Sequence, residues 1–336
     1  MTVELIQGLL LAFAVVVIVM PAYLRLLRWA GFVKQIRVEG PESHQVKYGT
    51  PTMGGLLLII VIVGLFIALQ GLPQRGAIAP LATMLLVGLL GAFDDYLNAR
   101  TGEGITARQK LLWLAVVSGL IAFQIQTTYR IDQIAVPFVG AVDIAPWLFI
   151  AFAAFAIIAT SNGVNITDGL DGLAGGTLMI AYVAYLLVSL LNVVPLPDGS
   201  GATGNQPNLA LFCALVIGAL LGFLWFNVHP AQVFMGDAGA LSLGAALAVT
   251  ALISGQILIL PIVGFVFVLE TSSDILQIGY FKLTGGKRIL KMAPLHHHFE
   301  LSGWDEEKIT LRFWIIGILA ALLGVILFLA SIDRLQ

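Results

Sequence analysis

Five aspartates stand in three short stretches of a chain that is otherwise largely apolar. Asp94 and Asp95 are adjacent in GAFDDYLN, Asp168 and Asp171 lie three residues apart in NGVNITDGLDGLAGG, and Asp237 lies in FMGDAGALSLG. Carboxylate oxygens are hard ligands, and Mg²⁺ is usually held by one or two carboxylates together with substrate phosphates. If the three stretches meet in the folded chain, they predict a metal–phosphate site.

The spacing limits how the adjacent pair can act. Side chains of neighbouring helical residues project about 100° apart, so Asp94 and Asp95 cannot point in the same direction. We expect one of them to bind or attack while the other is turned aside. The sequence does not say which one does the chemistry.

The stretch around Asp168 allows three interpretations. In a helix, Asn162, Asn165, Asp168 and Asp171 would form a ladder on one face, because residues three apart are neighbours. In a glycine-rich loop that enters a helix, free backbone N–H groups would cradle an anion. Thr167, Asp168 and Asp171 could instead cap the next helix. The DD and GD stretches at the same predicted membrane face favour the metal–phosphate interpretation.

Basic and hydroxyl side chains flank the same stretches. Lys47 precedes PTMGG, which contains Thr52, and Lys110 begins another apolar run. A lysine can bind a diphosphate as a point charge, and paired glycines allow the backbone to approach a ligand closely. A single lysine beside a membrane span is more often a topology signal, so this part of the prediction depends on the aspartates.

Three consecutive histidines, His296, His297 and His298, stand in APLHHHFELSGW. Consecutive side chains diverge, so at most two of them could reach one metal ion. We therefore interpret the run as phosphate donors or proton carriers rather than as a transition-metal site. His44 and His229 are isolated in the sequence, and we assign them no chemistry.

Three other residues fall at the same predicted face. Phe234 precedes Asp237 by three residues and could stack on a nucleobase, although a lone aromatic is more often an interfacial anchor. Asn227 and Gln277 end apolar runs, where an amide could read a base edge or simply reach toward the polar interface.

Composition places the chain in a membrane. Its 336 residues are 59% hydrophobic and 11% charged, whereas soluble domains are about 25% charged. The net charge of −2 implies no general attraction to nucleic acid. The sequence contains no Walker A motif, so ATP-driven transport has no support. It also contains no G-x-S-x-G elbow. The single cysteine, Cys213, is predicted to be a buried hydrophobe.

Ten apolar runs approach the length of about 20 residues that a membrane-spanning helix needs. They are 5–27, 54–70, 78–97, 111–127, 146–159, 172–191, 209–226, 240–254, 257–281 and 311–331. We predict an all-α polytopic membrane protein with about ten transmembrane helices that forms one integral-membrane domain over residues 1–336.

The placement of basic residues predicts the orientation. Loops that follow odd-numbered runs hold 12 of the 17 Lys and Arg residues, and Arg25 and Arg312 lie at the edges of these loops. Such an excess marks the cytoplasmic side. Both termini are then periplasmic, and the aspartate stretches lie at the cytoplasmic face. We also expect a small hairpin within 131–144 and a short amphipathic helix within 282–310.

Five stretches carry a family resemblance. PTMGG, DDYLN, NGVNITDGLDGLA, FMGDAGALSLG and PLHHHFELSGW, in this order, resemble the phospho-N-acetylmuramoyl-pentapeptide transferase family of the polyprenyl-phosphate N-acetylhexosamine-1-phosphate transferase superfamily. The resemblance covers essentially the whole chain. The three histidines favour this family over relatives that transfer GlcNAc-1-phosphate.

The resemblance implies roles for particular residues. It implies that Asp237 binds Mg²⁺ and that Asp94 and Asp95 lie at the catalytic centre, where we also count His296. Around the nucleoside and diphosphate it places Lys47, Asn165, Asp168, Gly169, Leu170, Asp171, Asn227, Phe234, Gln277, His297 and His298. To these we add Thr52, Lys110 and Asn162 because they lie at the same predicted face.

The resemblance also implies a reaction, in which phospho-MurNAc-pentapeptide passes from UDP-MurNAc-pentapeptide to undecaprenyl phosphate with Mg²⁺, giving lipid I and UMP at the bacterial inner membrane. It further implies a homodimer and a bent ninth helix beside a lipid groove, a bend that Pro261 and Gly264 would permit. We expect direct attack by the lipid phosphate rather than a covalent enzyme intermediate.

Two alternative functions remain at this point. A polyprenyl-phosphate GlcNAc-1-phosphate transferase would share most of the stretches. A secondary transporter of an anionic metabolite belongs to another class, and it predicts acids near the bilayer midplane at a repeat interface. The aspartates cluster at one predicted face and no internal repeat is visible, which favours the transferase.

Overall fold

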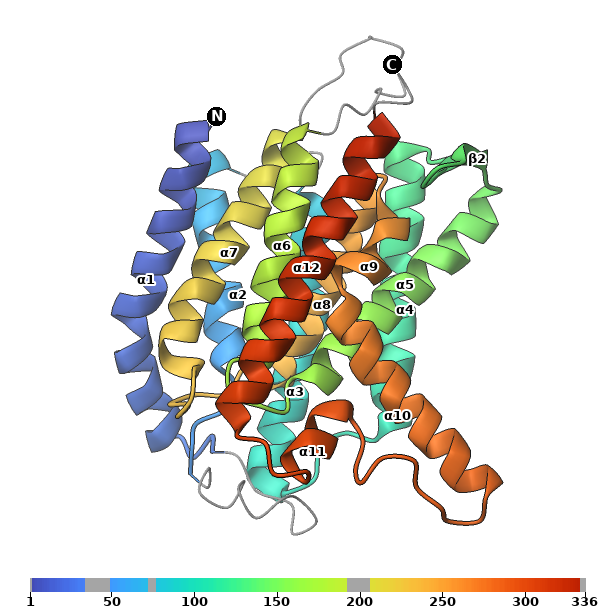
Figure 1. The fold of residues 1–336 in the computed structure, drawn as a ribbon. Helices are drawn as coiled ribbons and strands as arrows, with labels where there is room; N and C mark the ends of the chain where they lie inside the picture. The colour runs from blue at the N-terminus through green and yellow to red at the C-terminus, as the bar shows by residue number, and fades with distance from the viewer. Residues whose placement is uncertain (1, 34–48, 72–76, 192–205, 333–336) are drawn as a thin grey trace.

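The computed structural model describes residues 2–33, 49–71, 77–191 and 206–332, and it is almost entirely helical (Figure 1). Its elements are α1 (Thr2–Trp29), α2 (Gly54–Gln70), α3 (Ile78–Thr101), α4 (Ala107–Tyr129), β1 (Gln133–Val136), β2 (Gly140–Asp143), α5 (Pro146–Thr167), α6 (Leu173–Leu191), α7 (Pro207–Asn227), α8 (Gly236–Ile253), η2 (Ile257–Ile259), α9 (Leu260–Val263), α10 (Phe265–Leu283), α11 (Leu295–Glu300) and α12 (Glu306–Ile332). The prediction of an all-α polytopic membrane protein is confirmed.

All ten predicted apolar runs are helical. Within the described residues, eight helices are long and apolar enough to cross a membrane, and the bent pair of Ile257–Val263 with Phe265–Leu283 makes a ninth. Helix α2 is also apolar but is shorter than these helices. It has 17 residues, which give a rise of about 26 Å at 1.5 Å per residue. The chain breaks at Gly264 with a bend of 78°, so the expected bend in this segment is confirmed.

The fifth helix is longer than its apolar run because its polar residues are satisfied. The run ends at residue 159, whereas α5 continues to Thr167. The hydroxyl of Thr160 donates to the Ala156 carbonyl, and the amide of Asn162 donates to the Ile158 carbonyl. Ser161 donates to the Leu241 carbonyl of α8 at 2.8 Å. Polar groups bonded in this way add little cost to a buried helix.

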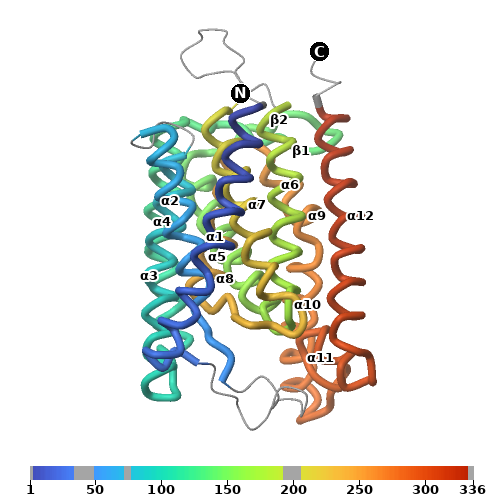
Figure 2. The backbone as a smooth tube through the Cα atoms, turned by 90° about the vertical axis from the view of Figure 1, so that its left-hand side faces the viewer, coloured from blue at the N-terminus to red at the C-terminus, as the bar shows by residue number. Residues whose placement is uncertain are grey.

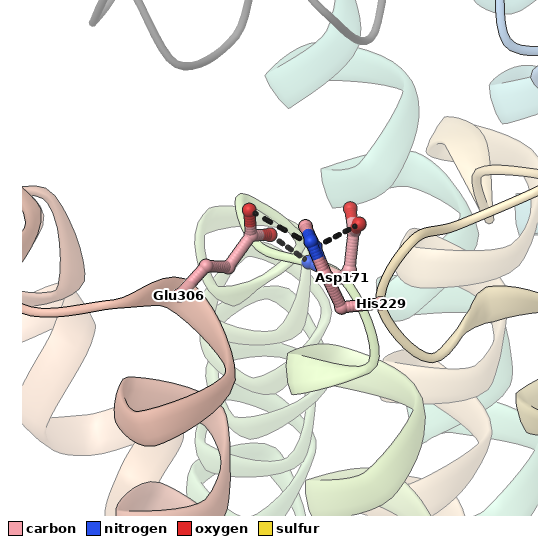
Figure 3. Close-up of side chains that lie close together, drawn as sticks. All are labelled: Asp171, His229 and Glu306. Atoms are coloured by element: carbon pink, nitrogen blue, oxygen red, sulfur yellow. Dashed lines mark hydrogen bonds and ion pairs between the residues drawn. The ribbon is translucent and has the colours of Figure 1, made fainter.

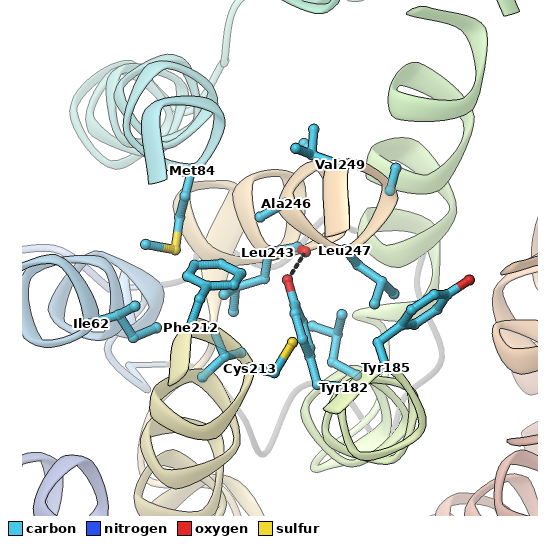
Figure 4. Packing of buried hydrophobic residues seen from close by; sticks show 14 of the residues in the cluster. Ile62, Met84, Tyr182, Tyr185, Phe212, Cys213, Leu243, Ala246, Leu247 and Val249 are labelled. Carbon is cyan, nitrogen blue, oxygen red and sulfur yellow. Dashed lines mark hydrogen bonds between the residues drawn. The ribbon is translucent and has the colours of Figure 1, made fainter. Parts of the chain in front are cut away.

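Helix α8 forms the centre of the bundle. Nearly all of its residues are buried, and it packs against α2, α3, α5 and α6. Its sequence is rich in glycine and alanine, which let helix backbones approach closely. Figure 4 shows the packing beside α8, where the Tyr182 hydroxyl donates to the Leu243 carbonyl at 2.8 Å. Cys213 lies in this apolar packing as a free, buried thiol, as predicted.

The two ends of the bundle differ. The start of α1, the end of α12 and the predicted hairpin, now seen as β1 paired antiparallel with β2, lie at one end (Figures 1 and 2). The six-residue helix α11 lies at the other end, within the segment where a short helix was expected. Chain ends on one side are consistent with an even number of crossings.

Candidate functional site

Asp95 of α3 is bonded to the first turn of α8. Its Oδ1 accepts the backbone N–H of Asp237 at 3.1 Å, and its Oδ2 accepts that of Ala238 at 3.0 Å. The N–H groups of a first helical turn have no intrahelical partner, and the positive end of the helix dipole favours a carboxylate there. The two helices can come this close because a Cβ at Gly91 would overlap the Asp237 backbone.

Asp94 faces the α3–α4 turn instead. Its Oδ1 accepts the Ile105 N–H at 2.6 Å, and its Oδ2 accepts a hydrogen bond from Lys110 Nζ at 2.8 Å. Lys110 is positioned by a capping box at the start of α4, in which the Thr106 and Gln109 side chains bond each other's backbone N–H. The adjacent aspartates therefore diverge, as helix geometry requires.

Asp237 completes the cluster from α8. Its Oδ2 accepts a hydrogen bond from Lys110 Nζ, and its Oδ1 accepts one from the Asn165 amide of α5 at 2.8 Å. Lys110 thus bridges Asp94 and Asp237. Side chains from α3, α4, α5 and α8, which span the sequence from Asp94 to Asp237, meet at one end of the bundle.

The cluster opens into a cavity of about 180 Å³. The lining residues are Val33, Thr52, Asp95, Asn98, Ala99, Asn165, Asp168, Phe234, Gly236 and Asp237. At about 30 Å³ for each water, this space suits a phosphate group with a hydrated ion. Asp94 is not among the described lining residues, whereas Asp95 is. Val33, Asn98, Ala99 and Gly236 were not among the predicted site residues, although Asn98 and Gly236 lie in the quoted stretches DDYLN and FMGDAGALSLG.

The donor set fits a hard divalent cation. The cavity wall offers the carboxylates of Asp95, Asp168 and Asp237, and the nearest described ammonium is that of Lys110. Lys110 already occupies a bridging position between Asp237 and Asp94, the second of which lies outside the cavity wall. Oxygen ligands around a site that can retain waters match the preference of Mg²⁺.

The segment after α5 is neither a continuous ladder nor a simple helix cap. Helix α5 ends at Thr167, and Asp168 is its C-terminal cap residue. Asn165 and Asp168 reach the cavity, whereas Asn162 bonds within its own helix and Asp171 turns toward a different group. Of the three interpretations, the helical ladder does not extend to all four residues, because α5 ends at Thr167, before Asp171.

Asp171 belongs to a second polar group, shown in Figure 3. Its Oδ2 lies 3.0 Å from His229 Nδ1 and accepts the Ala231 N–H, and its backbone N–H donates to Glu306 Oε1 at 2.6 Å. His229 Nδ1 also lies 3.6 Å from Glu306 Oε2. His229 is therefore not isolated, contrary to its appearance in the sequence.

The group of Asp171, His229 and Glu306 offers ligand atoms within 4.8 Å of one another, a spacing that a metal ion could bridge. Hydrogen bonds between the same atoms already account for the arrangement. The group joins the loops before α6 and α8 to the start of α12, and no local sequence pattern pointed to it.

Two amides from the predicted set support loop backbones. Asn227 accepts the Gly172 N–H at 3.1 Å and donates to the Val233 carbonyl at 2.8 Å. Gln277 accepts the N–H groups of Ile289 and Leu290 and donates to the Leu290 carbonyl. Both side chains are buried, so in this structure they act as scaffolds.

Gly169 and Leu170, which lie between Asp168 and Asp171 in the sequence, are closely packed against other side chains. Leu170 lies in a small apolar cluster with Leu173 and Phe313. Gly169 is packed so closely against His296 that a Cβ there would overlap the imidazole Nε2. Lys47 lies outside the described residues.

The three histidines on α11 have different partners, although the expected divergence fails for His296 and His297, whose ring centroids are 4.2 Å apart. His296 is 1% exposed, and its Nδ1 lies 2.9 Å from Glu270 Oε2. His297 Nδ1 lies 2.7 Å from Glu300 Oε2, and His298 Nδ1 accepts the Lys291 N–H at 3.1 Å. Of the three, His296 is the one packed against the segment that follows Asp168.

Comparisons with known proteins agree with this architecture. Residues 77–255 match the family described as glycosyl transferase family 4. The chain is 41% identical to the phospho-N-acetylmuramoyl-pentapeptide-transferase of Desulfotalea psychrophila, over 96% of this chain and 92% of the relative. It is 43% identical to the protein of the same name from Chloroflexus aurantiacus, over 97% and 90%, and 40% identical to that from Halalkalibacterium halodurans, over 96% and 97%.

The scaffold role of Asn227 predicts a stability effect. Replacing it in Asn227→Leu leaves the buried Gly172 N–H and Val233 carbonyl without this partner, at about 1–3 kcal/mol for a buried polar group. We expect a lower midpoint of thermal unfolding in detergent. The matched control is Asn162→Leu, since Asn162 bonds only a carbonyl of its own helix. Equal midpoints for the two variants would contradict the scaffold role.

Proposed function

The chain belongs to the phospho-N-acetylmuramoyl-pentapeptide-transferase family, and on that premise we propose that it transfers phospho-MurNAc-pentapeptide from UDP-MurNAc-pentapeptide to undecaprenyl phosphate. The products are lipid I and UMP, and the reaction is a step of peptidoglycan synthesis in the bacterial inner membrane. The observation that carries the proposal is the cluster of Asp95, Asp237 and Lys110 at a cavity at one end of a lipid-embedded bundle.

The chemistry explains why such a cluster is needed. An oxygen of the lipid phosphate attacks the sugar-bearing phosphorus of the donor, and the bond between that phosphorus and the UMP oxygen breaks. Both partners are anions, so mutual repulsion is a large part of the barrier, and preorganised positive groups lower it most effectively. Bound Mg²⁺ supplies such charge and helps to align the phosphates.

We assign the roles from the geometry of the cluster. Asp237, which lines the cavity and is held by Asn165, is the principal Mg²⁺ ligand. Asp95 also faces the cavity and orients the lipid phosphate or accepts its proton for direct attack. Asp94, turned toward the α3–α4 turn, holds Lys110 in place, and the Lys110 ammonium neutralises the donor diphosphate.

In this proposal the donor is bound in the same cavity, beside the carboxylates. Phe234 lines the cavity, and its backbone is fixed because its N–H donates to the Pro51 carbonyl and its own carbonyl accepts the Gly54 N–H. An aromatic ring held in this way suits stacking on uracil. Thr52 and Asp168 line the same space, and we assign the His296–His298 segment to the diphosphate because His296 packs against Gly169, which follows Asp168.

The orientation and assembly remain proposals of the same kind. The basic loops support a cytoplasmic position for the cavity, where the soluble donor is found, and the lipid acceptor would reach it from the bilayer. Residues 1–336 form one domain, supported by the packing of α8 against helices from both halves of the chain. We also propose a homodimer, which the mass of the detergent-extracted protein would test.

The central experiment is a lipid-product assay. Membranes containing the protein are incubated with labelled UDP-MurNAc-pentapeptide and undecaprenyl phosphate, with and without a chelator of divalent ions. We expect labelled lipid and UMP in equal amounts, and loss of both with the chelator. Transfer from UDP-GlcNAc in place of UDP-MurNAc-pentapeptide would support the alternative transferase, and sugar uptake into vesicles without UMP release would support a transporter.

The ligand role of Asp237 predicts the effect of Asp237→Asn. The amide can still accept from Asn165 but no longer offers a charged oxygen. We expect turnover to fall about 100-fold or more, since metal stabilisation is worth several kcal/mol. Asp132→Asn, at an exposed position at the opposite end of the bundle, is the control. Turnover that keeps its normal dependence on Mg²⁺ concentration in Asp237→Asn would refute the assignment.

The stacking role of Phe234 predicts a selective effect on donor binding. Removal of an aromatic platform in Phe234→Ala costs about 1–3 kcal/mol for a stacked base, or about 5- to 150-fold in affinity. We expect the dissociation constant for the UDP donor to rise by this factor, while the KM for the lipid acceptor changes much less. An unchanged donor affinity, measured by calorimetry, would leave Phe234 with a packing role alone.

A further inference from the structure

A buried acid–imidazole pair lies outside the carboxylate cluster. Glu270 is on α10 and His296 is on α11, and their side chains are 0% and 1% exposed. Glu270 Oε2 lies 2.9 Å from His296 Nδ1 and 3.5 Å from the His296 backbone nitrogen. The carboxylate therefore bonds the ring at Nδ1 and restricts its rotation.

The opposite ring nitrogen has no such partner. Within the part of the chain that the structure describes, His296 Nε2 is buried and makes no hydrogen bond. It faces Gly169, and a side chain at that position would overlap it. Gly169 directly follows Asp168, which lines the cavity. The ring is thus fixed on one side by Glu270, and on the other side it presents a polar atom to the segment that borders the cavity.

The pair determines which ring nitrogen can meet a further partner. A carboxylate that is fully withdrawn from solvent is stable only when a positive or hydrogen-bonding partner compensates it. The partner found here is His296, whose Nδ1 lies 2.9 Å from Glu270 Oε2. With Nδ1–H given to Glu270, an imidazolium also carries an N–H at Nε2, which is a donor suited to a phosphate oxygen.

We propose that Glu270 is a positioning residue that holds His296 so that its Nε2–H donates to a phosphate oxygen of the nucleotide-sugar diphosphate. The inference rests on the proposed function and deepens it, because it assigns the group that orients the histidine. Gly169 lies on the opposite side of the ring from Glu270. Only a residue without a side chain leaves room there for His296 Nε2.

The test compares Glu270→Gln, His296→Ala and the double variant in the lipid-product assay. Glutamine keeps an acceptor for Nδ1–H and removes the charge. We expect kcat/KM for the donor to fall about 10- to 100-fold, the range seen when partners that orient a histidine are lost. We expect the double variant to equal His296→Ala alone, because a residue that acts through His296 has nothing left to position. Losses that multiply in the double variant would overturn the proposal.

The matched control is Asp274→Asn, the same chemical change one turn along the same face of α10. We expect its kcat/KM to stay within about twofold of the unmodified protein, a small effect for a charge change that removes no bond to the ring. If Glu270→Gln does not fold, Glu270→Asp serves in its place, since it keeps the charge and shortens the reach by one methylene. Its kcat/KM should also fall, and unmodified activity would overturn the proposal.

A second measurement does not depend on turnover. In protein labelled with ¹⁵N-histidine, the His296 resonances are assigned from their absence in His296→Ala. We expect protonated-nitrogen shifts at both ring positions in the unmodified protein, and loss of the Nε2 proton in Glu270→Gln. Ring shifts that do not respond to Glu270→Gln would overturn the inference about the pair. Absence of lipid product in the unmodified protein would instead overturn the proposed function, so the two failures are distinguishable.

Discussion

The site depends on the bond between the Asp95 carboxylate and the first turn of α8. The N–H groups that begin a helix have no partner within it, and inside a bundle no water replaces one, so a carboxylate from α3 satisfies two of them at once. Because Asp237 is itself in that first turn, the bond that joins α8 to α3 also fixes where the Asp237 carboxylate lies. The close approach at Gly91 is a condition for both. The contact between α3 and α8 therefore fixes both the packing of the two helices and the position of the Asp237 carboxylate.

The positive charge in the cluster is positioned by a local interaction at the start of α4. The capping box at Thr106 determines where α4 begins. Lys110 lies four residues after Thr106, between Asp94 and Asp237. Asp94 and Asp237 share the Lys110 ammonium, which leaves one negative charge, and an ionised Asp95 adds a second, so that one divalent cation would balance the cluster. In a site of low polarity that balance is worth more than in water. The cluster is therefore suited to exchange partners when an anionic substrate arrives together with a metal ion.

The sequence predicted the helices well because lipid imposes a strict length on apolar runs, and it predicted the cluster because acids are rare in such a chain. It missed Glu270, an acid within the ninth run whose partner His296 is 26 residues away, although an ionisable residue in a span is itself a signal of function. It also missed His229, whose contacts with Asp171 and Glu306 connect distant loops. The spacing of three residues suggested a helical ladder that reached Asp171, whereas α5 ends at Thr167. A spacing pattern does not show where a helix ends. These misses share one cause, which is that a long-range partner leaves no local trace.

The scaffold amides change how variants at this end of the bundle must be interpreted. Asn227 and Gln277 were predicted to meet substrate, yet both bond the backbone of loops that border the site. Loss of either would disturb those loops, and activity would fall even without a direct contact. Asp237 differs, because its carboxylate lines the cavity and its loss leaves the α8 backbone bonds to Asp95 in place. A fall in activity therefore identifies a substrate contact only where the free energy of unfolding is unchanged, and that comparison separates the groups that do chemistry from those that hold them.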